Sequence, residues 1–290
     1  MPIAVMGLIS ACSAGHGDHE AATTASQSVS SAVPEKAAAA EASGFVSQIK
    51  DMSFSAATAL PKAPASAASQ ADCGGFALSP QSSAARALAA AGWGVTGEGR
   101  IGAYQIVSFA GGFEPATSGT CEVSKGHLAV YQGGRLVALA AMRAGAKADI
   151  GHIAGFGKVG LRIWDGDVVP MPLADLRLTD QGLVIGTLAA EEQTCGGAVP
   201  RIDHLPVTRA RARLIAAGWS PINHGGPGHR SDSREADLAR KGVIEVESCS
   251  GTGFGFCSYG YKRGAAVLSV TTFGDGEDPI VSDDAVRCGR

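Results

Sequence analysis

The segments SPQSSAARALAAAGW, residues 79–93, and LPVTRARARLIAAGW, residues 205–219, share one pattern of alanines, a leucine and a final Gly-Trp. Apolar residues at helical spacing, followed by glycine, predict a helix that ends at Gly92 and another that ends at Gly218. The tryptophan after each glycine is expected to lie in the core beneath its helix. These two segments predict that the chain contains two divergent copies of one unit.

Strand-like runs separated by glycine turns follow each helical segment. The clearest is a hairpin in which His127–Tyr131 and Arg135–Met142 flank Gln132-Gly133-Gly134. Later runs are Val243–Ser248, Phe256–Tyr261 and Ala265–Phe273. The sequence therefore predicts an α+β fold with two tandem units, each a helix packed on an antiparallel β-sheet.

Composition divides the chain into four expected segments. Residues 13–72 are so rich in Ala, Ser and Thr that they bury too little apolar surface to offset the entropy lost on ordering. The segments are residues 1–12, a signal and lipobox segment; 13–72, a disordered tether; 73–198, a β-rich unit with one N-terminal helix; and 199–290, a helix with a disulfide-hairpin sheet.

The N-terminal segment indicates export. Residues 1–11 are mainly apolar and carry no charge, as in the core of a signal peptide. They lead into Ile9-Ser10-Ala11-Cys12, which resembles the lipobox of bacterial lipoproteins. The resemblance implies that Cys12 carries lipid, and Ser13 after it implies an outer-membrane lipoprotein on the periplasmic face of the cell envelope.

The cysteines fit the same compartment. The chain has 7 cysteines, so six remain beside Cys12, an even number that favours three disulfides in an exported protein. Cys249 and Cys257 flank a glycine-rich turn that brings them within bonding distance, so they are the predicted local pair. The others pair in one of three ways that the sequence leaves open: Cys73, Cys121, Cys195 and Cys288.

Two resemblances concern the second unit. The residues Val199-Pro200, Leu205, Ala210, Leu214 and Gly218 resemble the opening of PASTA domains, which bind peptidoglycan fragments or their synthases. The pattern Gly218-Trp219, Cys249-Ser250-Gly251-Thr252-Gly253, Cys257 and Leu268-Ser269-Val270-Thr271-Thr272 resembles a recurrent domain of uncharacterised bacterial exported proteins. The first implies a helix-on-sheet shape, and the second implies an envelope location.

Several functional classes are not supported by the sequence. A net charge of −3 argues against nucleic-acid binding, and two Gly-x-Gly-x-x-Gly strings lack the strand-then-helix context of a nucleotide site. The sequence contains no run of 18 apolar residues, so it predicts no conventional membrane-spanning helix. No cofactor or metal is predicted, although the acidic residues 275–284 are oxygen donors of the kind calcium takes. His127, His152 and His204 are interpreted as isolated structural or exposed residues.

The candidate binding residues are Tyr259, Tyr261, His224 and His229. Strand alternation puts Cys257, Tyr259 and Tyr261 on one face of Phe256–Tyr261, and Phe256 on the other. Either the tyrosines cover the core beneath the helix, or they form a recognition surface beside the polar loop 223–234.

The predicted function is a membrane-tethered envelope lipoprotein that acts as a non-catalytic binding module. Its expected partners are the membrane, through the lipid anchor, and an envelope protein or peptidoglycan. One alternative is a hydrolase-like envelope enzyme assembled around the 224–232 loop from His224, His229, Asp232 and Glu247. Another is a purely structural envelope protein. No catalytic residue is assigned.

Overall fold

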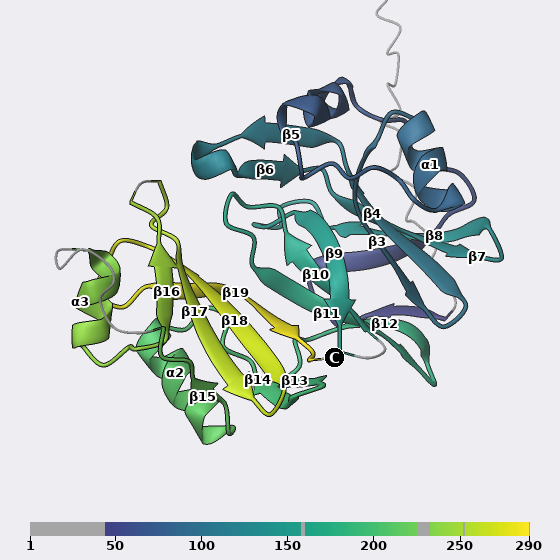
Figure 1. Cartoon of the computed structure of the whole chain (residues 1–290). Helices are drawn as coiled ribbons and strands as arrows, with labels where there is room; N and C mark the ends of the chain where they lie inside the picture. The colour runs from purple at the N-terminus through teal and green to yellow at the C-terminus, as the bar shows by residue number, and fades with distance from the viewer. Residues whose placement is uncertain (1–43, 158–159, 225–232, 252, 290) are drawn as a thin grey trace, which may run out of the picture. The chain divides into compact units, whose positions relative to one another are not determined.

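The protein is mostly β. The structure is a computed structural model that describes residues 44–157, 160–224, 233–251 and 253–289. Strands contain 47% of the residues and helices 15%, and the strands form several sheets (Figure 1). The predicted α+β fold of two tandem helix-on-sheet units is therefore wrong, because most strands before residue 190 pack sheet against sheet rather than beneath a helix.

Two five-stranded sheets make up the first part of the chain. Sheet I is antiparallel and has the strand order β2 (Met52–Ala56), β8 (Arg135–Met142), β7 (His127–Gln132), β4 (Tyr104–Ala110) and β3 (Gly94–Ile101). Sheet II has the order β1 (Phe45–Ser47), β12 (Gly182–Gly186), β11 (Pro172–Thr179), β10 (Gly160–Asp165) and β9 (Ile150–Phe156), with β1 parallel to β12. The predicted hairpin at 127–142 is the β7–β8 pair.

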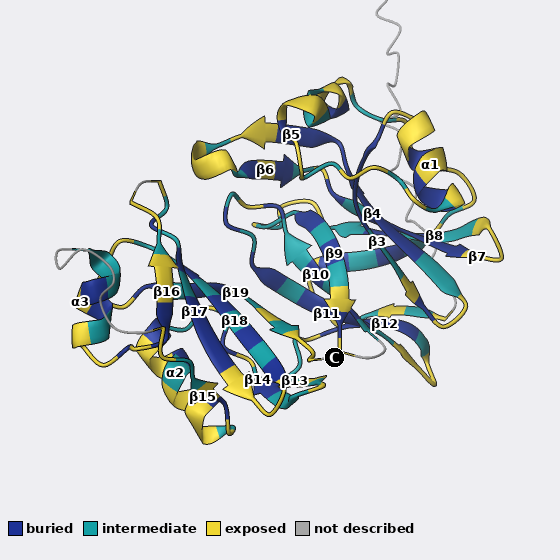
Figure 2. Cartoon of the chain, in the orientation of Figure 1, coloured by how far each residue is buried: buried dark blue, intermediate teal, exposed yellow. Residues whose placement is uncertain are grey.

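Sheet I is buried on both faces, which explains its nearly continuous apolar runs. Along β7, Leu128 and Val130 pack against sheet II, whereas Ala129 and Tyr131 pack beneath helix α1 (Ser83–Ala90). Figure 2 shows the strands of sheet I mainly in the colours of buried and intermediate residues. A strand covered on both sides cannot alternate between apolar and polar residues. The helix therefore covers only the outer face of sheet I, and the main core lies between the two sheets.

The edges of sheets I and II approach closely at β3 and β9. The backbone N–H of Ile153 donates to Ser108 Oγ at 3.1 Å. A Cβ atom on Gly97 would lie 2.6 Å from the carbonyl oxygen of Ile153, so a side chain at position 97 would push the two edges apart. This contact fixes the position of β9.

The segment before α1 contains regular structure, including two strands of the sheets. Residues 44–72 were expected to lie in the disordered tether, but they contain β1, β2 and the 3-10 helix Ala65–Asp72, so this part of the prediction is wrong. Regular pairing with β12 and β8 overrides their low-complexity composition. The rest of the predicted tether, residues 13–43, and the signal segment lie outside the described residues.

Helix α1 and helix α2 (Val207–Ala216) end in the same way. Gly92 and Gly218 both have positive φ, 89° and 87°, a conformation that glycine adopts without steric cost. The tryptophan that follows each is 3% and 1% exposed, for Trp93 and Trp219 respectively. Both indole N–H groups donate to backbone carbonyls. The prediction that these tryptophans lie in the core is confirmed.

The last part of the chain forms sheet III with two helices. Its strands are β15 (Ser220–Pro221), β17 (Cys257–Arg263), β18 (Ala266–Phe273) and β19 (Ile280–Arg287), with β16 (Val246–Cys249) also paired to β17. Helices α2 and α3 (Arg234–Arg240) contribute to the core on one face of this sheet. Among the described residues, no helix has both the length and the apolar character needed to cross a bilayer.

Two short hairpins and three disulfides complete the fold. The hairpins are β5 (Gly112–Pro115) with β6 (Cys121–Ser124), which flank the 3-10 turn Thr117–Gly119, and β13 (Glu191–Thr194) with β14 (Gly197–Pro200). The disulfides are Cys249–Cys257, Cys73–Cys121 and Cys195–Cys288. The predicted local pair is confirmed, and the structure selects one of the three arrangements left open for the others.

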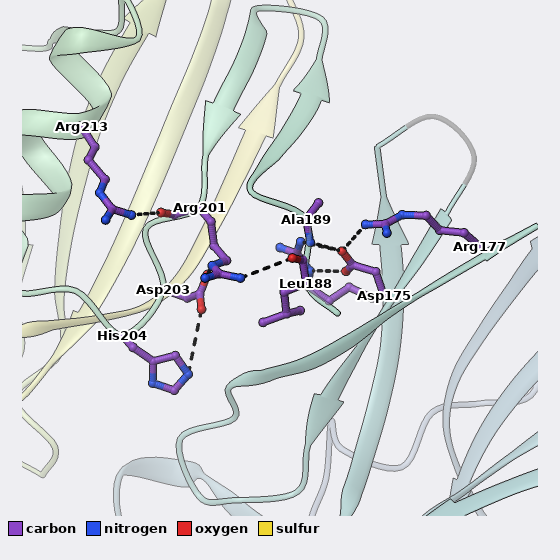
Figure 3. Close-up of polar contacts among 9 residues, drawn as sticks. Asp175, Arg177, Leu188, Ala189, Arg201, Asp203, His204 and Arg213 are labelled. Carbon is purple, nitrogen blue, oxygen red and sulfur yellow. Dashed lines mark hydrogen bonds and ion pairs between the residues drawn. The ribbon is translucent and has the colours of Figure 1, made fainter. Parts of the chain in front are cut away.

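A buried carboxylate links sheet II to the segment that leads toward sheet III. Asp175 is 0% exposed. It accepts a hydrogen bond from Arg162 Nε at 2.9 Å. It also accepts one from the Ala189 backbone N–H at 2.7 Å and forms an ion pair with Arg177 (Figure 3). Next to this cluster, Arg201 donates to the carbonyl of Leu188. Asp175 therefore fixes the chain just after β12.

Replacement of Asp175 by Ala should lower the free energy of unfolding by about 3–5 kcal/mol, because it leaves two arginines without their buried partner. Guanidinium denaturation followed by circular dichroism measures this change. The matched control is Asp180→Ala, an exposed carboxylate at the end of the same sheet, which should change stability by less than about 0.5 kcal/mol. Equal losses in the two variants would contradict the structural role of Asp175.

Candidate functional site

A cavity of about 340 Å³ lies where the outer face of sheet II meets the open face of sheet III. This is within the range of ~300–1,000 Å³ that is usual for small-molecule sites. Its apolar walls include Phe76, Trp164, Val169 and Phe256. Its polar lining consists of Thr120, His152, Thr271, Ser282 and Asp283.

His152 and Trp164 form the wall that sheet II contributes. They are direct cross-strand partners on β9 and β10, so both side chains stand on the same face of the sheet. Their rings stack with centroids 5.7 Å apart and an interplanar angle of 6°. The neighbouring residue Ile153 points into the main core, and strand alternation therefore directs His152 outward.

The imidazole of His152 is available to a ligand. Burial lowers the pKa of His152, so the ring is neutral at pH 7 and offers one hydrogen-bond donor and one acceptor. No residue within the described ranges forms a hydrogen bond with it. A half-buried imidazole with both nitrogens unused is suited to bind a polar group that enters the cavity.

The indole N–H of Trp164 is also without a hydrogen-bond acceptor among the described residues. Its Nε1 atom is sealed from solvent. A buried donor without a partner costs about 1–3 kcal/mol. Trp93 and Trp219, by contrast, both have carbonyl acceptors for this group.

Sheet III closes the cavity from the other side. Phe256 lies just before β17, and Thr271 and Asp283 are cross-strand partners on β18 and β19. Because Phe256 and Cys257 alternate, the disulfide-bonded Cys257 lies on the opposite, core face of the strand. The predicted alternation along Phe256–Tyr261 is thus correct, but Phe256 is the residue that reaches the site.

Tyr259 and Tyr261 do not form a recognition surface, and this interpretation is wrong. They are 0% and 1% exposed and belong to the core beneath α2 and α3. The hydroxyl of Tyr261 donates to Glu245 Oε1 at 2.7 Å, and that of Tyr259 accepts from Thr272 Oγ1 at 3.4 Å. Burial, followed by the carboxylate of Glu245, raises the pKa of Tyr261. The alternative interpretation, in which the tyrosines cover the core, is confirmed.

Of the site residues predicted in and near the 224–232 loop, the structure describes His224 and Glu247. His224 is exposed and lies close to β17, because a Cβ atom on Gly260 would be 2.7 Å from its Nε2 atom. His224 does not line the cavity. Glu247 is exposed on β16. His229 and Asp232 lie outside the described residues, and so does Cys12.

Sequence reasoning missed the residues that line the cavity. His152 was interpreted as an isolated histidine and Asp283 as part of an acidic stretch. The signal that identifies them is the pairing of β9 with β10, which sets His152 opposite Trp164. Within the described part of the chain, no group of three or more His, Cys, Asp or Glu residues is placed to hold a metal ion.

A comparison of the chain with models of known protein families, with curated proteins and with solved structures finds no match. The resemblances to PASTA domains and to exported bacterial domains therefore stay predictions. A proposal for the function therefore rests on the residues that line the cavity.

Strand β19, which supplies Asp283 to the cavity, also carries Asp284. Asp284 and Arg162 of β10 line the same small pocket. Burial raises the pKa of Asp284 to about 7, and the nearby carboxylates of Asp283 and Glu192 act in the same direction, whereas Arg162 opposes them. In the unfolded chain this carboxyl has its ordinary pKa of ~3.9. The folded protein therefore binds this proton more tightly than the unfolded chain.

Because the folded pKa is raised, the contribution of Asp284 to stability falls as pH rises from about 4 to about 7 and is constant above that. Asp284→Asn removes the charge and should raise the melting temperature by ~2–5 °C at pH 8, with little effect at pH 4. Calorimetry at both pH values measures this. Asp180→Asn is the exposed control. A melting temperature that falls at pH 8 in the Asp284 variant would contradict the assignment.

Proposed function

We propose that the chain is an exported, non-catalytic binding protein that holds a small, mainly apolar ligand in the cavity between Trp164 and Phe256. The observation that carries this proposal is the pair His152 and Trp164, because both rings line a cavity with unused hydrogen-bonding groups. Apolar walls with a few polar groups are typical of ligand sites.

A second candidate function is an envelope enzyme, and one observation favours it. His152 and Asp283 line the same cavity, and imidazole and carboxylate groups are common general acids and bases. The binding function is the first choice because the cavity wall is mainly apolar. Conversion of a bound ligand into product would favour the enzyme.

The proposed location outside the cytoplasm has one structural support. Three disulfides link all six cysteines after Cys12, and such bonds persist in oxidising compartments such as the periplasm. The proposed tether to the outer membrane rests on the lipobox-like residues before Cys12. In this proposal, the lipid holds the binding cavity near the membrane surface, where its partner is an envelope component.

The neutral probe N-phenyl-1-naphthylamine should bind the purified chain saturably, with a rise in its fluorescence. His152→Ala should weaken this binding about tenfold, because it removes one aromatic wall and the free imidazole. The matched control is His127→Ala. His127 is also a half-buried histidine stacked on an aromatic ring, but it lies on sheet I and does not line the cavity. Absent binding, or equal loss in both variants, would overturn the proposed site.

The lipid anchor is tested in cells. In a bacterium with two membranes, the chain should incorporate an alkyne-labelled palmitate and sediment with the membranes. Cys12→Ala should abolish the label, because the thiol is the predicted acceptor, whereas Ser28→Ala should retain it. Labelling that persists without Cys12 would refute the lipoprotein assignment.

A further inference from the structure

The charge inside the candidate cavity is not balanced by its own lining. Among the described residues that line the cavity, Asp283 is the single carboxylate, and none is a lysine or an arginine. Asp283 forms no ion pair within the described part of the chain, whereas the buried Asp175 pairs with two arginines. His152 adds no positive charge, because burial lowers its pKa and keeps the ring neutral at pH 7.

Two hydroxyl groups of the lining already donate their protons to the backbone. Thr120 Oγ1 donates to the carbonyl oxygen of Thr117 at 2.8 Å, and Ser282 Oγ donates to that of Thr271 at 3.3 Å. A hydroxyl whose single proton is used in this way can offer a ligand only the lone pairs of its oxygen. Together with the carboxylate of Asp283, these hydroxyls present hydrogen-bond acceptors to a ligand.

Aromatic rings form much of the remaining wall. Phe76, Trp164 and Phe256 come from three separate parts of the chain, and His152 stacks on Trp164. The face of an aromatic ring carries a negative potential, so it attracts a cation that lies within about 6 Å of the ring centroid. The rings and the carboxylate therefore favour the same kind of ligand group, and the rings also offer contact area to an apolar body.

Taking the proposed binding function as its basis, we propose that the ligand is a small organic ammonium ion, a protonated amine on an apolar body, whose N–H groups bind Asp283 and the hydroxyl oxygens. The absent counter-charge, the hydroxyls that can only accept and the aromatic wall each favour this class. An anionic ligand would be repelled by Asp283. A neutral ligand would bury its apolar body equally well but would leave Asp283 without a cation.

The test compares three compounds of similar size that share a phenyl ring. They are 2-phenylethylamine, which is a cation at pH 7, the neutral 2-phenylethanol and the anion 3-phenylpropionate. Each is titrated into the oxidised, ¹⁵N-labelled full chain, and the indole N–H signals are followed by NMR. Trp164→Phe identifies the signal of Trp164. This signal should shift on binding, whereas those of Trp93 and Trp219, which lie in the core beneath their helices, should not.

The amine should bind about tenfold more tightly than the alcohol in 50 mM NaCl, and the carboxylate should bind most weakly. The expected preference is no larger than this, because Asp283 is exposed and solvent screens its charge. For the same reason, the difference between the amine and the alcohol should shrink in 500 mM NaCl.

The role of the carboxylate is tested by Asp283→Asn, which keeps the size of the side chain and removes its charge. It should reduce the preference for the amine over the alcohol to about twofold. The charge-matched control is Asp180→Asn, an exposed residue outside the cavity, which should keep the full preference. The neutral probe N-phenyl-1-naphthylamine should bind the Asp283→Asn variant as tightly as the unmodified chain, because the cavity wall is intact.

The outcomes separate the two proposals. If the neutral probe binds and responds to His152→Ala, but the amine binds no more tightly than the alcohol, the ammonium proposal is overturned and the binding function stands. A preference for the amine that survives Asp283→Asn also overturns it. Loss of probe binding in that variant does so too, because Asp283 would then support the cavity wall instead of the ligand. If the probe does not bind the unmodified chain, the proposed function fails first.

Discussion

The position of the candidate site depends on the close approach of β3 and β9. Gly97 lets the two edges meet, and the hydrogen bond from the Ile153 N–H to Ser108 on β4 holds β9 against sheet I. With Ile153 held in the core between sheets I and II, His152 has to stand on the outer face beside Trp164. A larger side chain at position 97 would displace β9, and the wall of the cavity would move with it.

Two buried carboxylates, Asp175 and Glu245, have arginine partners within the fold. Asp175 is buried with two arginines and a backbone N–H, so its charge is fully used within the fold. Glu245 is buried with Arg211 and Tyr261 on Oε1, while its Oε2 atom has no partner among the described residues. Both carboxylates therefore have a cationic partner within the fold.

Local features of the fold were predictable from the sequence, whereas the packing of the sheets was not. Glycine after a helix, the β7–β8 turn and the spacing of Cys249 and Cys257 act over short distances, and the structure confirms them. Apolar runs such as 128–131 indicate burial, but they do not reveal whether a helix or a second sheet covers each face. The sequence also did not reveal that His152 pairs with Trp164, because this pairing depends on the register between β9 and β10.

The first strand has a consequence for how the chain reaches its fold. Phe45 in β1 pairs with Leu183 in β12, and its neighbour β2 pairs with β8. Because β12 lies far along the chain from β1, β1 has no partner until most of sheet II has emerged, whether from a ribosome or during export. Such distant pairing slows folding. We therefore expect β1 to join its sheet late, and a chaperone that shields its free edge would favour productive folding.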